Sequence, residues 1–562
     1  MITEETYNWV EELLDPKITE ISDSDYDRLV KDYFQKDKRD WLEKNRILEY
    51  VSNIVSFWRL IRKFSIPKGK KLKIYNFKNF VFPSFYEMEI NENNNFWTNY
   101  EDKIFQHSVD FREATFLDYS VFEKVIFEKD VKFQYIEFEN NLIIKDCTFK
   151  GNVLFQKSKI NNLNLISSTF SNNFNFTDNE CNGDVNIFNT SFQGFLPSFY
   201  DSKFHKKVIF SKTTFSSAAC RFNESIFLDD VEFFECKFKP KQKIEFQAVN
   251  FTKKVDFIRC EFLNDTNFNQ SQFQGVTIFD RPIFKEETDF SYCYFEDVNF
   301  KEINTIWPYR NYNYTEPPKL YFKDVFFNSK TFIKNTNLSE LELDNSDVTN
   351  ITFSRCIWND EKNRLKLVNE LPILNIETKN KLKLSNQNEA KKIVVENLIN
   401  KLRDSENHYR QLKKNFDSTK NWELSGKAYV SEMEMRRLRY KKEKSVSSKI
   451  SFIIYSIYEH LGGYTQSFVR PLNILLLFTL FIFPLYYFTE SLIYYSLWNC
   501  SFTESFSLVS VSECFQMSID AALPIFKPKH TYLFWGVQYF QTIFCGTLLT
   551  FFILALRKRF KQ

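Results

Sequence analysis

Phenylalanine recurs along the middle of the chain at alternating steps of five and six residues. The pattern is clearest at Phe111, Phe116, Phe122, Phe127, Phe133 and Phe138, and it returns between residues 227 and 300. A helix repeats every ~3.6 residues and a strand every ~2, so neither explains a period of about 5.5. A fixed internal period is typical of a solenoid, in which short units bury apolar side chains only against their neighbours. We therefore predict a repeat domain over residues 105–358.

The residue two positions before most of these phenylalanines is small or β-branched. Examples are Ala114, Val125, Val131, Cys147 and Val153. Residues two apart on an extended segment point to the same side, so ring and small partner would both face inward. The positions between them are mostly polar, which suits a solvated exterior. A β-sandwich of short strands is the alternative, but sandwich strands do not keep one double period over so many residues.

This pattern resembles the pentapeptide-repeat family in its phenylalanine-centred form. The resemblance implies a mainly β solenoid, a right-handed quadrilateral β-helix with four units per coil. Gly151, Gly194 and Gly275 each lie two residues after a Phe, where we expect a corner that requires positive φ. The phenylalanine pattern breaks at an insertion, 301–320, and resumes at Phe322, Phe327 and Phe332. The insertion is aromatic, and it is either a recognition loop or a segment packed on the outside.

Helical patterns flank the repeats. Residues 1–64 predict helices that either cap the first coil or bind a partner, and 65–104 connect them to the solenoid. Residues 359–387 read as a linker, and 388–462 as a helical hairpin with a juxtamembrane segment. The hairpin resembles the helix pair that links repeats to membrane spans in many bacterial membrane-bound pentapeptide proteins. That resemblance implies interior contacts by Tyr409, Leu412, Phe416, Trp422, Ala428, Tyr429, Met433 and Met435.

Two uncharged stretches, 472–489 and 532–556, lie in the last module, 463–562. Each is long enough to cross the ~30 Å hydrocarbon core as a helix. The flanks are basic and the loop between the stretches is acidic, so the positive-inside rule places both termini and the repeats in the cytoplasm, at an inner membrane. The acidic first residues do not form a signal peptide. The basic residues expected at the inner membrane surface are Arg436, Arg437, Arg439, Lys441, Lys442, Arg557, Lys558 and Arg559.

The loop between the spans contains an apolar, small-residue stretch, 505–526, that predicts a short helix. It is either a re-entrant pore helix or an amphipathic helix lying on the outer membrane face. The arrangement resembles the two-helix pore module of ion channels, but residues 521–525 contain no glycine, so a potassium filter is not supported. Thr542 is a further candidate for hydrogen bonds between the spans. The candidate pore-lining residues are Glu513, Gln516, Ser518, Asp520, Asn473, Gln538 and Gln541.

Composition narrows the function classes. Six of the ten cysteines occupy the small inward position, which favours reduced core thiols. With five histidines and no CxxC pair, we expect neither a metal site nor a cofactor, and no catalytic motif predicts an enzyme. The mildly acidic repeats do not predict nucleic-acid binding. Two functions remain. In one, a cytoplasmic sensing rod is coupled to a homo-oligomeric, channel-like membrane module. In the other, a non-conducting scaffold, anchored in the lipid bilayer by its apolar helices, holds a cytoplasmic protein partner.

Overall fold

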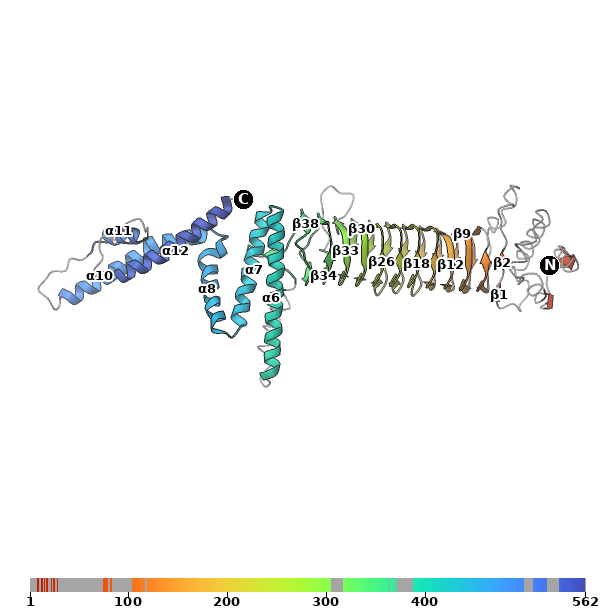
Figure 1. Cartoon of the computed structure of the whole chain (residues 1–562), viewed down its shortest axis with the longest axis horizontal. Helices are drawn as coiled ribbons and strands as arrows, with labels where there is room; N and C mark the ends of the chain where they lie inside the picture. The colour runs from red at the N-terminus through yellow and green to blue at the C-terminus, as the bar shows by residue number, and fades with distance from the viewer. Residues whose placement is uncertain are drawn as a thin grey trace. The chain divides into compact units, whose positions relative to one another are not determined.

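The computed structural model describes residues 104–116, 119–304, 317–361, 363–368, 370, 388–499, 509–522 and 535–560, with 74–78, 81–82 and isolated positions between 8 and 28. Most of the predicted helical region 1–64 and residues 305–316 of the insertion lie outside them. The chain divides into two compact units, Met1–Asn359 and Asp360–Gln562. Figure 1 shows the solenoid strands of the first unit and the helices of the second.

Residues 104–354 form a β-solenoid of about 11 turns. One turn shows its plan, because four short strands lie in succession on four parallel ladders: β4 (Ser108–Asp110), β5 (Thr115–Phe116), β6 (Ser120–Glu123) and β7 (Ile126–Phe127). The ladders of β4 and β5 begin at β1 (Ile74–Asn76) and β2 (Val81–Phe82), so strands of the predicted connection 65–104 join the solenoid. The ladders of β4, β5, β6 and β7 end, in that order, at β37 (Glu342–Asp344), β35 (Phe326–Phe327), β38 (Ile351–Ser354) and β31 (Ile283–Phe284).

The corner between the ladders of β5 and β6 is spanned in places by one continuous strand. The long strands that do so are β9 (Glu137–Lys145), β12 (Lys159–Ile166), β30 (Gln272–Asp280) and β33 (Tyr294–Lys301). Register shifts within the β9–β12 and β30–β33 pairs mark the corner itself. The strands of successive coils therefore keep their pairing on both sides of this corner, whether or not one continuous strand spans it.

Phenylalanine rings stack directly above one another along the core. On the 9-stranded ladder that begins at β3 (Ile104–Phe105), Phe105 pairs with Phe127, Phe127 with Phe149 and Phe149 with Phe170. The centroids of successive rings lie 4.9, 4.7 and 4.7 Å apart, which matches the spacing of hydrogen-bonded strands. The predicted ladder of inward rings is thus confirmed.

The alternation of five and six residues has a backbone cause. Between Phe111 and Phe295, residues with positive φ recur at intervals near eleven, and each lies within a five-residue step. Lys124 falls between Phe122 and Phe127, and Tyr135 lies in the next such step. The six-residue step from Phe127 to Phe133 contains no positive φ in this described stretch. One left-handed residue thus turns the chain in five residues, and most corners without one take six. The steps from Ile160 to Leu165 and from Phe295 to Phe300 are exceptions, since they take five residues without a positive φ.

The expectation of positive φ at Gly151, Gly194 and Gly275 is wrong, because Gly463 alone among the described glycines has it. These glycines lie instead where the backbone of the preceding coil comes close. A Cβ at Gly275 would lie 2.3 Å from the carbonyl carbon of Lys253. Glycine is needed there for space rather than for conformation.

The small inward residue that follows a left-handed corner often makes a hydrogen bond, in addition to filling the core. The Cys147 thiol donates to the carbonyl oxygen of Phe122 at 3.2 Å, and the Ser158 hydroxyl to that of Phe133 at 2.7 Å. A buried carbonyl therefore finds a partner in the next coil. Burial raises the pKa of the Cys147 thiol to about 12, and the described cysteines are free.

The inward pattern shifts by one residue after the insertion. Phe295 pairs with Phe327 over a coil that is longer than its neighbours, and Phe300 then pairs with Ile333. Ile333 is fully buried, so the prediction of an inward Phe332 is wrong. Phe332 instead lies beneath the ammonium of Lys334, whose Nζ is 4.6 Å from its ring centre.

The second unit begins with a small antiparallel pair, β39 (Asp360–Glu361) and β40 (Arg364–Leu365). The hairpin follows as α6 (Asn388–Ser418) and α7 (Trp422–Lys442), with Asn421 accepting from the amide of Leu424 at the start of α7. Its interior holds Tyr409, Leu412, Phe416, Ala428, Met433 and Met435, whereas Trp422 is exposed at the helix start, contrary to expectation. Tyr409 hydrogen-bonds to Glu370 and to the amide of Leu367, which joins the segment after β40 to the hairpin.

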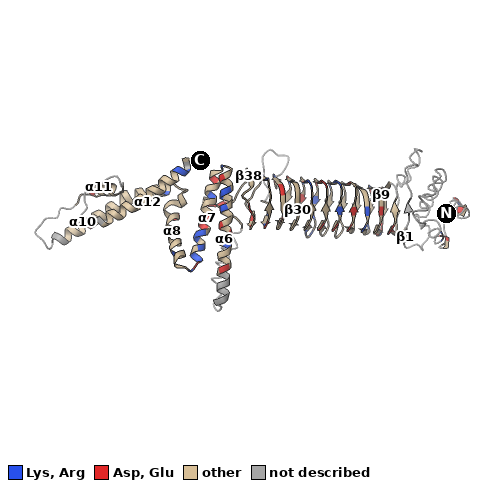
Figure 2. Ribbon diagram, in the orientation of Figure 1, with Lys and Arg blue, Asp and Glu red and all other residues tan. Residues whose placement is uncertain are grey.

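The remaining helices carry the apolar sequence. They are α8 (Val446–Gly462), η3 (Gly463–Thr465), α9 (Val469–Leu477), the π-helical η4 (Phe478–Ile482), α10 (Phe483–Asn499), α11 (Val511–Ala522) and α12 (Trp535–Phe560). Figure 2 shows Lys, Arg, Asp and Glu interspersed over the solenoid and the α6–α7 hairpin, whereas α10 contains only Glu490 and α12 carries its charges in the last turn. Charge is thus concentrated outside the apolar helices.

Candidate functional site

Two helices are long and apolar enough to cross a membrane. They are Val469–Ser496, formed by α9, η4 and most of α10, with a mean hydropathy of 1.9, and Gly536–Lys558 in α12, with 1.8. In each helix, only 22% of the most apolar 18-residue segment is buried, so the rest of the described chain covers little of that segment. Large apolar side chains such as Phe481, Leu485 and Ile543 are exposed. A core helix of a soluble protein would be mostly covered.

The short helix α11 packs against both of these long helices. Its inner side contributes Cys514 and Met517 to an apolar cluster with Phe483 and Tyr487 of α10 and Cys545 of α12. α11 runs antiparallel to α10, since the amide of Val509 donates to Ser491. The short helix predicted within 505–526 is thus part of the two-helix module.

Hydrogen bonds of polar side chains beside this apolar cluster connect α11 to the two long helices. The Ser518 hydroxyl donates to the carbonyl oxygen of Thr479 at 2.7 Å. The Gln541 amide donates to the backbone oxygen of Ser518 at 2.8 Å and accepts from the Tyr487 hydroxyl at 2.6 Å. Thr542 donates to the backbone oxygen of Ala521 at 2.8 Å. Gln541 thus bonds to the other long helix through Tyr487, whereas Thr542 bonds to α11 and to its own helix rather than to the other span.

This arrangement divides the candidate pore-lining residues into two groups. Ser518 and Gln541 are fully buried and bonded to each other, and Gln538 is buried on α12 with its Oε1 lacking a partner among the described residues. Glu513 and Gln516 are exposed and Asp520 is half-buried on the opposite side of α11. Asn473 is exposed on α9.

Glu513, Gln516 and Asp520 share one face of α11, since they are spaced by three and four residues. Glu513 also caps the helix, because its carboxylate accepts from the amide of Ser510 at 2.9 Å while the Ser510 hydroxyl accepts from the amide of Glu513 at 3.3 Å. This reciprocal pair is a capping box, which fixes where α11 begins. Ser512, Gln516 and Asp520 are further polar groups on the outer face of the helix.

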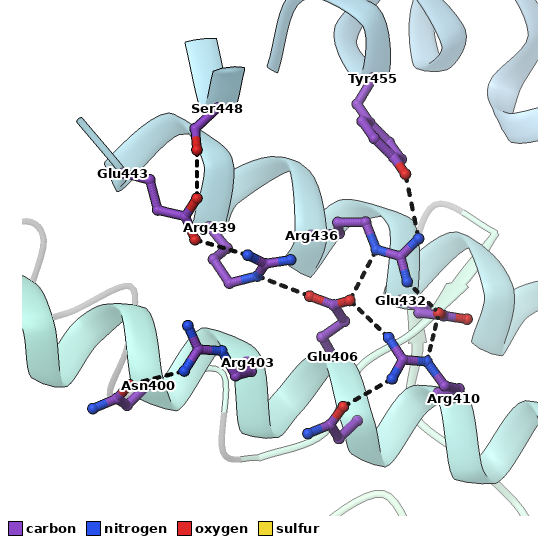
Figure 3. A network of polar contacts seen from close by, with 11 residues as sticks. Asn400, Arg403, Glu406, Arg410, Glu432, Arg436, Arg439, Glu443, Ser448 and Tyr455 are labelled. Atoms are coloured by element: carbon purple, nitrogen blue, oxygen red, sulfur yellow. Dashed lines mark hydrogen bonds and ion pairs between the residues drawn. The ribbon is translucent and has the colours of Figure 1, made fainter. Parts of the chain in front are cut away.

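Three of the predicted membrane-surface arginines, Arg436, Arg437 and Arg439, are engaged in ion pairs within the hairpin, and Figure 3 shows those of Arg436 and Arg439. The buried carboxylate of Glu406 on α6 accepts from Arg436 at 2.8 Å and from Arg439 at 3.0 Å. Arg410 bridges Glu406 and Glu432, and Arg437 pairs with Glu434 at 2.7 Å. Buried carboxylates require such partners, so these guanidinium groups hold helices together.

The same network reaches α8. Arg439 also pairs with Glu443, which accepts from the hydroxyl of Ser448 in α8, and Arg436 donates to the Tyr455 hydroxyl at 3.3 Å. Neither Glu406 nor Glu432 was identified from the sequence. Their helical spacing to Arg410 and Arg436 was the available signal, since both pairs are four residues apart.

The other predicted basic residues are placed differently. Lys441 and Arg557 are exposed, and the Lys558 ammonium lies over the ring of Tyr429, with Nζ 4.3 Å from the ring centre. Lys442 ends α7, and the side chain of Arg559 lies outside the described residues. In the described part of the chain, no group of three His, Cys, Asp or Glu side chains could hold a metal ion.

Comparison with known proteins supports the repeat architecture. Residues 246–293 match the family model described as pentapeptide repeats (9 copies). No curated protein and no solved structure matched the chain. The chain therefore contains pentapeptide repeats wound into a β-solenoid, followed by helices that include two candidate membrane spans.

Proposed function

We propose that this protein is an integral inner-membrane protein whose cytoplasmic solenoid is a sensing or binding rod and whose C-terminal helices assemble into an oligomeric, ion-conducting module. The observation that carries the proposal is the polar outer face of α11, with Glu513, Gln516 and Asp520, on a helix packed against two apolar spans. Two spans per chain do not enclose a pore, so at least three or four copies are required.

The depth of α11 supports this proposal. Ser518 bonds to Thr479, which lies ten residues after Val469, or about 15 Å along the helix. That distance is about half of a ~30 Å hydrocarbon core. A helix lying on the membrane surface would not reach this level. The re-entrant interpretation of 505–526 is therefore favoured over the interfacial one.

A carboxylate at this depth does not remain exposed to lipid. Insertion of an acidic side chain near the membrane centre costs about 2.5–3.5 kcal/mol, so Asp520 requires water or another protein surface beside it. In an oligomer, copies of Asp520 would form an acidic ring. Such a ring favours cations in a narrow path.

Conductance of purified protein in planar bilayers tests the proposal. We expect cation-preferring currents, and Asp520→Asn should shift the reversal potential toward that of a non-selective path without changing the oligomer mass in detergent. Glu423→Gln is the matched control, because Glu423 is exposed on α7 in the hairpin. A strictly monomeric protein in mild detergent, or the absence of current at all voltages, would refute the conducting function.

The alternative is a non-conducting anchor for a scaffold, and a separate observation favours it. Ser518 and Gln541 satisfy each other inside one chain, so these two side chains are not available to line a path. The solenoid meanwhile exposes aromatic side chains such as Phe195 and Phe326 that suit contact with a protein partner. A monodisperse monomer without conductance would support this function.

A further inference from the structure

We infer that a pocket between α6, α7 and α8 binds the phosphate headgroup of an anionic phospholipid, with the acyl chains lying along α8. The inference rests on the proposed membrane insertion of α9–α12, and it adds a specific lipid site at the base of the α6–α7 hairpin. Cations, phenols and an exposed apolar helix face meet there. None of the predicted pore-lining residues takes part.

The apolar half of the site is one face of α8. Ile450, Ile453, Ile454 and Ile457 recur at three- and four-residue spacing and are each about half exposed. The other side of α8 packs against the protein, since Tyr458 contacts Phe551 of α12 and Tyr455 contacts Tyr440 of α7. α8 ends six residues before α9 begins the first span, so its apolar face lies next to the membrane. A row of isoleucines in that place suits acyl chains.

The polar half is a pocket of about 550 Å³. Lys413 and Lys414 of α6, Tyr429 of α7 and Tyr458 of α8 line it, together with Ile454. Ile454 therefore belongs both to the pocket and to the exposed apolar face. This continuity matches an amphiphile, with an anionic group inside the pocket and hydrocarbon outside it.

The arginines of the pocket are already paired with carboxylates, so an anion would have to bind to other cations. Arg410 and Arg436 also line it, but Glu406 and Glu432 already pair with both. Figure 3 shows these guanidinium groups turned toward the carboxylates. They are therefore part of the frame of the pocket rather than its free cations.

The available cations are lysines. Lys413 pairs with Asp417 at 3.4 Å, and its Nζ lies 5.7 Å from the ring centre of Tyr429. The Lys558 ammonium lies 4.3 Å from the same centre. Among the described residues, no carboxylate is within ion-pair distance of Lys414 or Lys558. A phosphate diester would compensate both charges, and the pocket tyrosines could donate to its oxygens.

Thermal unfolding of the full-length protein in a neutral detergent tests the site without requiring assembly or conduction. We expect phosphatidylglycerol to raise the midpoint in a saturable manner and phosphatidylcholine to leave it unchanged. The double variant Lys414→Gln/Lys558→Gln should weaken the apparent phosphatidylglycerol affinity by about 30-fold, since each lysine near an anionic lipid contributes about fivefold. Lys441→Gln/Lys444→Gln is the matched control, because these exposed lysines neither line the pocket, as Lys414 does, nor lie over its Tyr429 ring, as Lys558 does.

Two further arms separate the sources of the effect. Inorganic phosphate should give little stabilisation, and Ile454→Ser should weaken lipid binding. An equal effect of phosphate would indicate a soluble ligand and overturn the lipid assignment. Equal shifts from both lipids, or an unchanged affinity of the lysine double variant, would overturn the site itself. Lipid-specific stabilisation of a monomer without conductance would refute the channel and leave the site intact.

Discussion

At the scale of single residues, the solenoid depends on what each inward position does for the coil beside it. A phenylalanine fills the core by stacking, as Phe257 does between Phe233 and Phe279 at centroid distances of 4.8 Å. A serine, threonine or cysteine after a left-handed corner closes a hydrogen bond to the preceding coil. Outward side chains such as Lys253 contribute a surface ion pair only.

Replacing an inward ring should therefore cost far more than replacing an outward lysine. Phe257→Ala should lower the free energy of unfolding of the solenoid by about 3–5 kcal/mol, because it opens a cavity. Lys253→Ala should leave it nearly unchanged, because an exposed ion pair such as that with Asp229 contributes little to stability. Denaturant unfolding followed by circular dichroism measures both values. Similar losses for the two variants would contradict the assignment of inward and outward positions.

The hydrogen-bonding position can be tested separately from the packing. Ser158→Ala removes the donor to the carbonyl oxygen of Phe133 and leaves that buried oxygen unpaired. We expect a loss of about 1–3 kcal/mol in the same unfolding measurement. Ser158→Cys should be milder, since Cys147 and Cys236 make the same contact elsewhere. If the alanine and cysteine variants were equally stable, the position would be steric only.

At the scale of elements, the helices α9–α12 are held together by polar contacts between segments that are far apart in the sequence. α11 is joined to η4 through Ser518 and Thr479, and to α12 through Gln541. Gln538 lies one turn before Gln541 on α12, yet its buried Oε1 has no partner in the described part of the chain. The two glutamines therefore differ in what they contribute.

This difference predicts opposite responses to the same substitution. Gln541→Leu should destabilise the packing of α11, because it leaves the backbone oxygen of Ser518 and the Tyr487 hydroxyl without this partner. We expect a lower midpoint of thermal unfolding in detergent and faster proteolysis of the loop that contains α11. Gln538→Leu should be neutral or stabilising within one chain. A destabilising Gln538→Leu would indicate that its side chain is bound by another copy or by water.

At the scale of the whole molecule, the distribution of charge determines the expected topology. The described solenoid and hairpin carry mixed charge, and the two spans carry almost none. Basic residues precede the first span and follow the second, while the loop between the spans is acidic. This asymmetry favours a cytoplasmic location for both termini and the solenoid.

Labelling of intact cells with a membrane-impermeant maleimide tests that topology. In a Cys500→Ser background, a cysteine placed at Lys529 should be labelled, and cysteines placed at Lys253 or Arg559 should react only after the cells are opened. The background removes Cys500, while Cys514, the other native thiol between the spans, is buried. The repeat thiols are buried as well, apart from the half-buried Cys356. Labelling at Lys253 in intact cells would reverse the orientation.

The sequence by itself determined the solenoid, its inward and outward positions up to Phe327 and the two apolar stretches long enough to span a membrane. Both depend only on local sequence. The solenoid requires a large buried side chain at a regular spacing along each coil, and a span requires a continuous run of apolar residues. The tertiary structure alone decided what depends on contacts between distant segments. Positions 151, 194 and 275 require glycine because the backbone of another coil approaches them closely. Glu406 can be buried because three arginines pair with its carboxylate. Lys413 and Lys558 meet at Tyr429 for the same reason, since helix packing brings together residues that no local pattern relates.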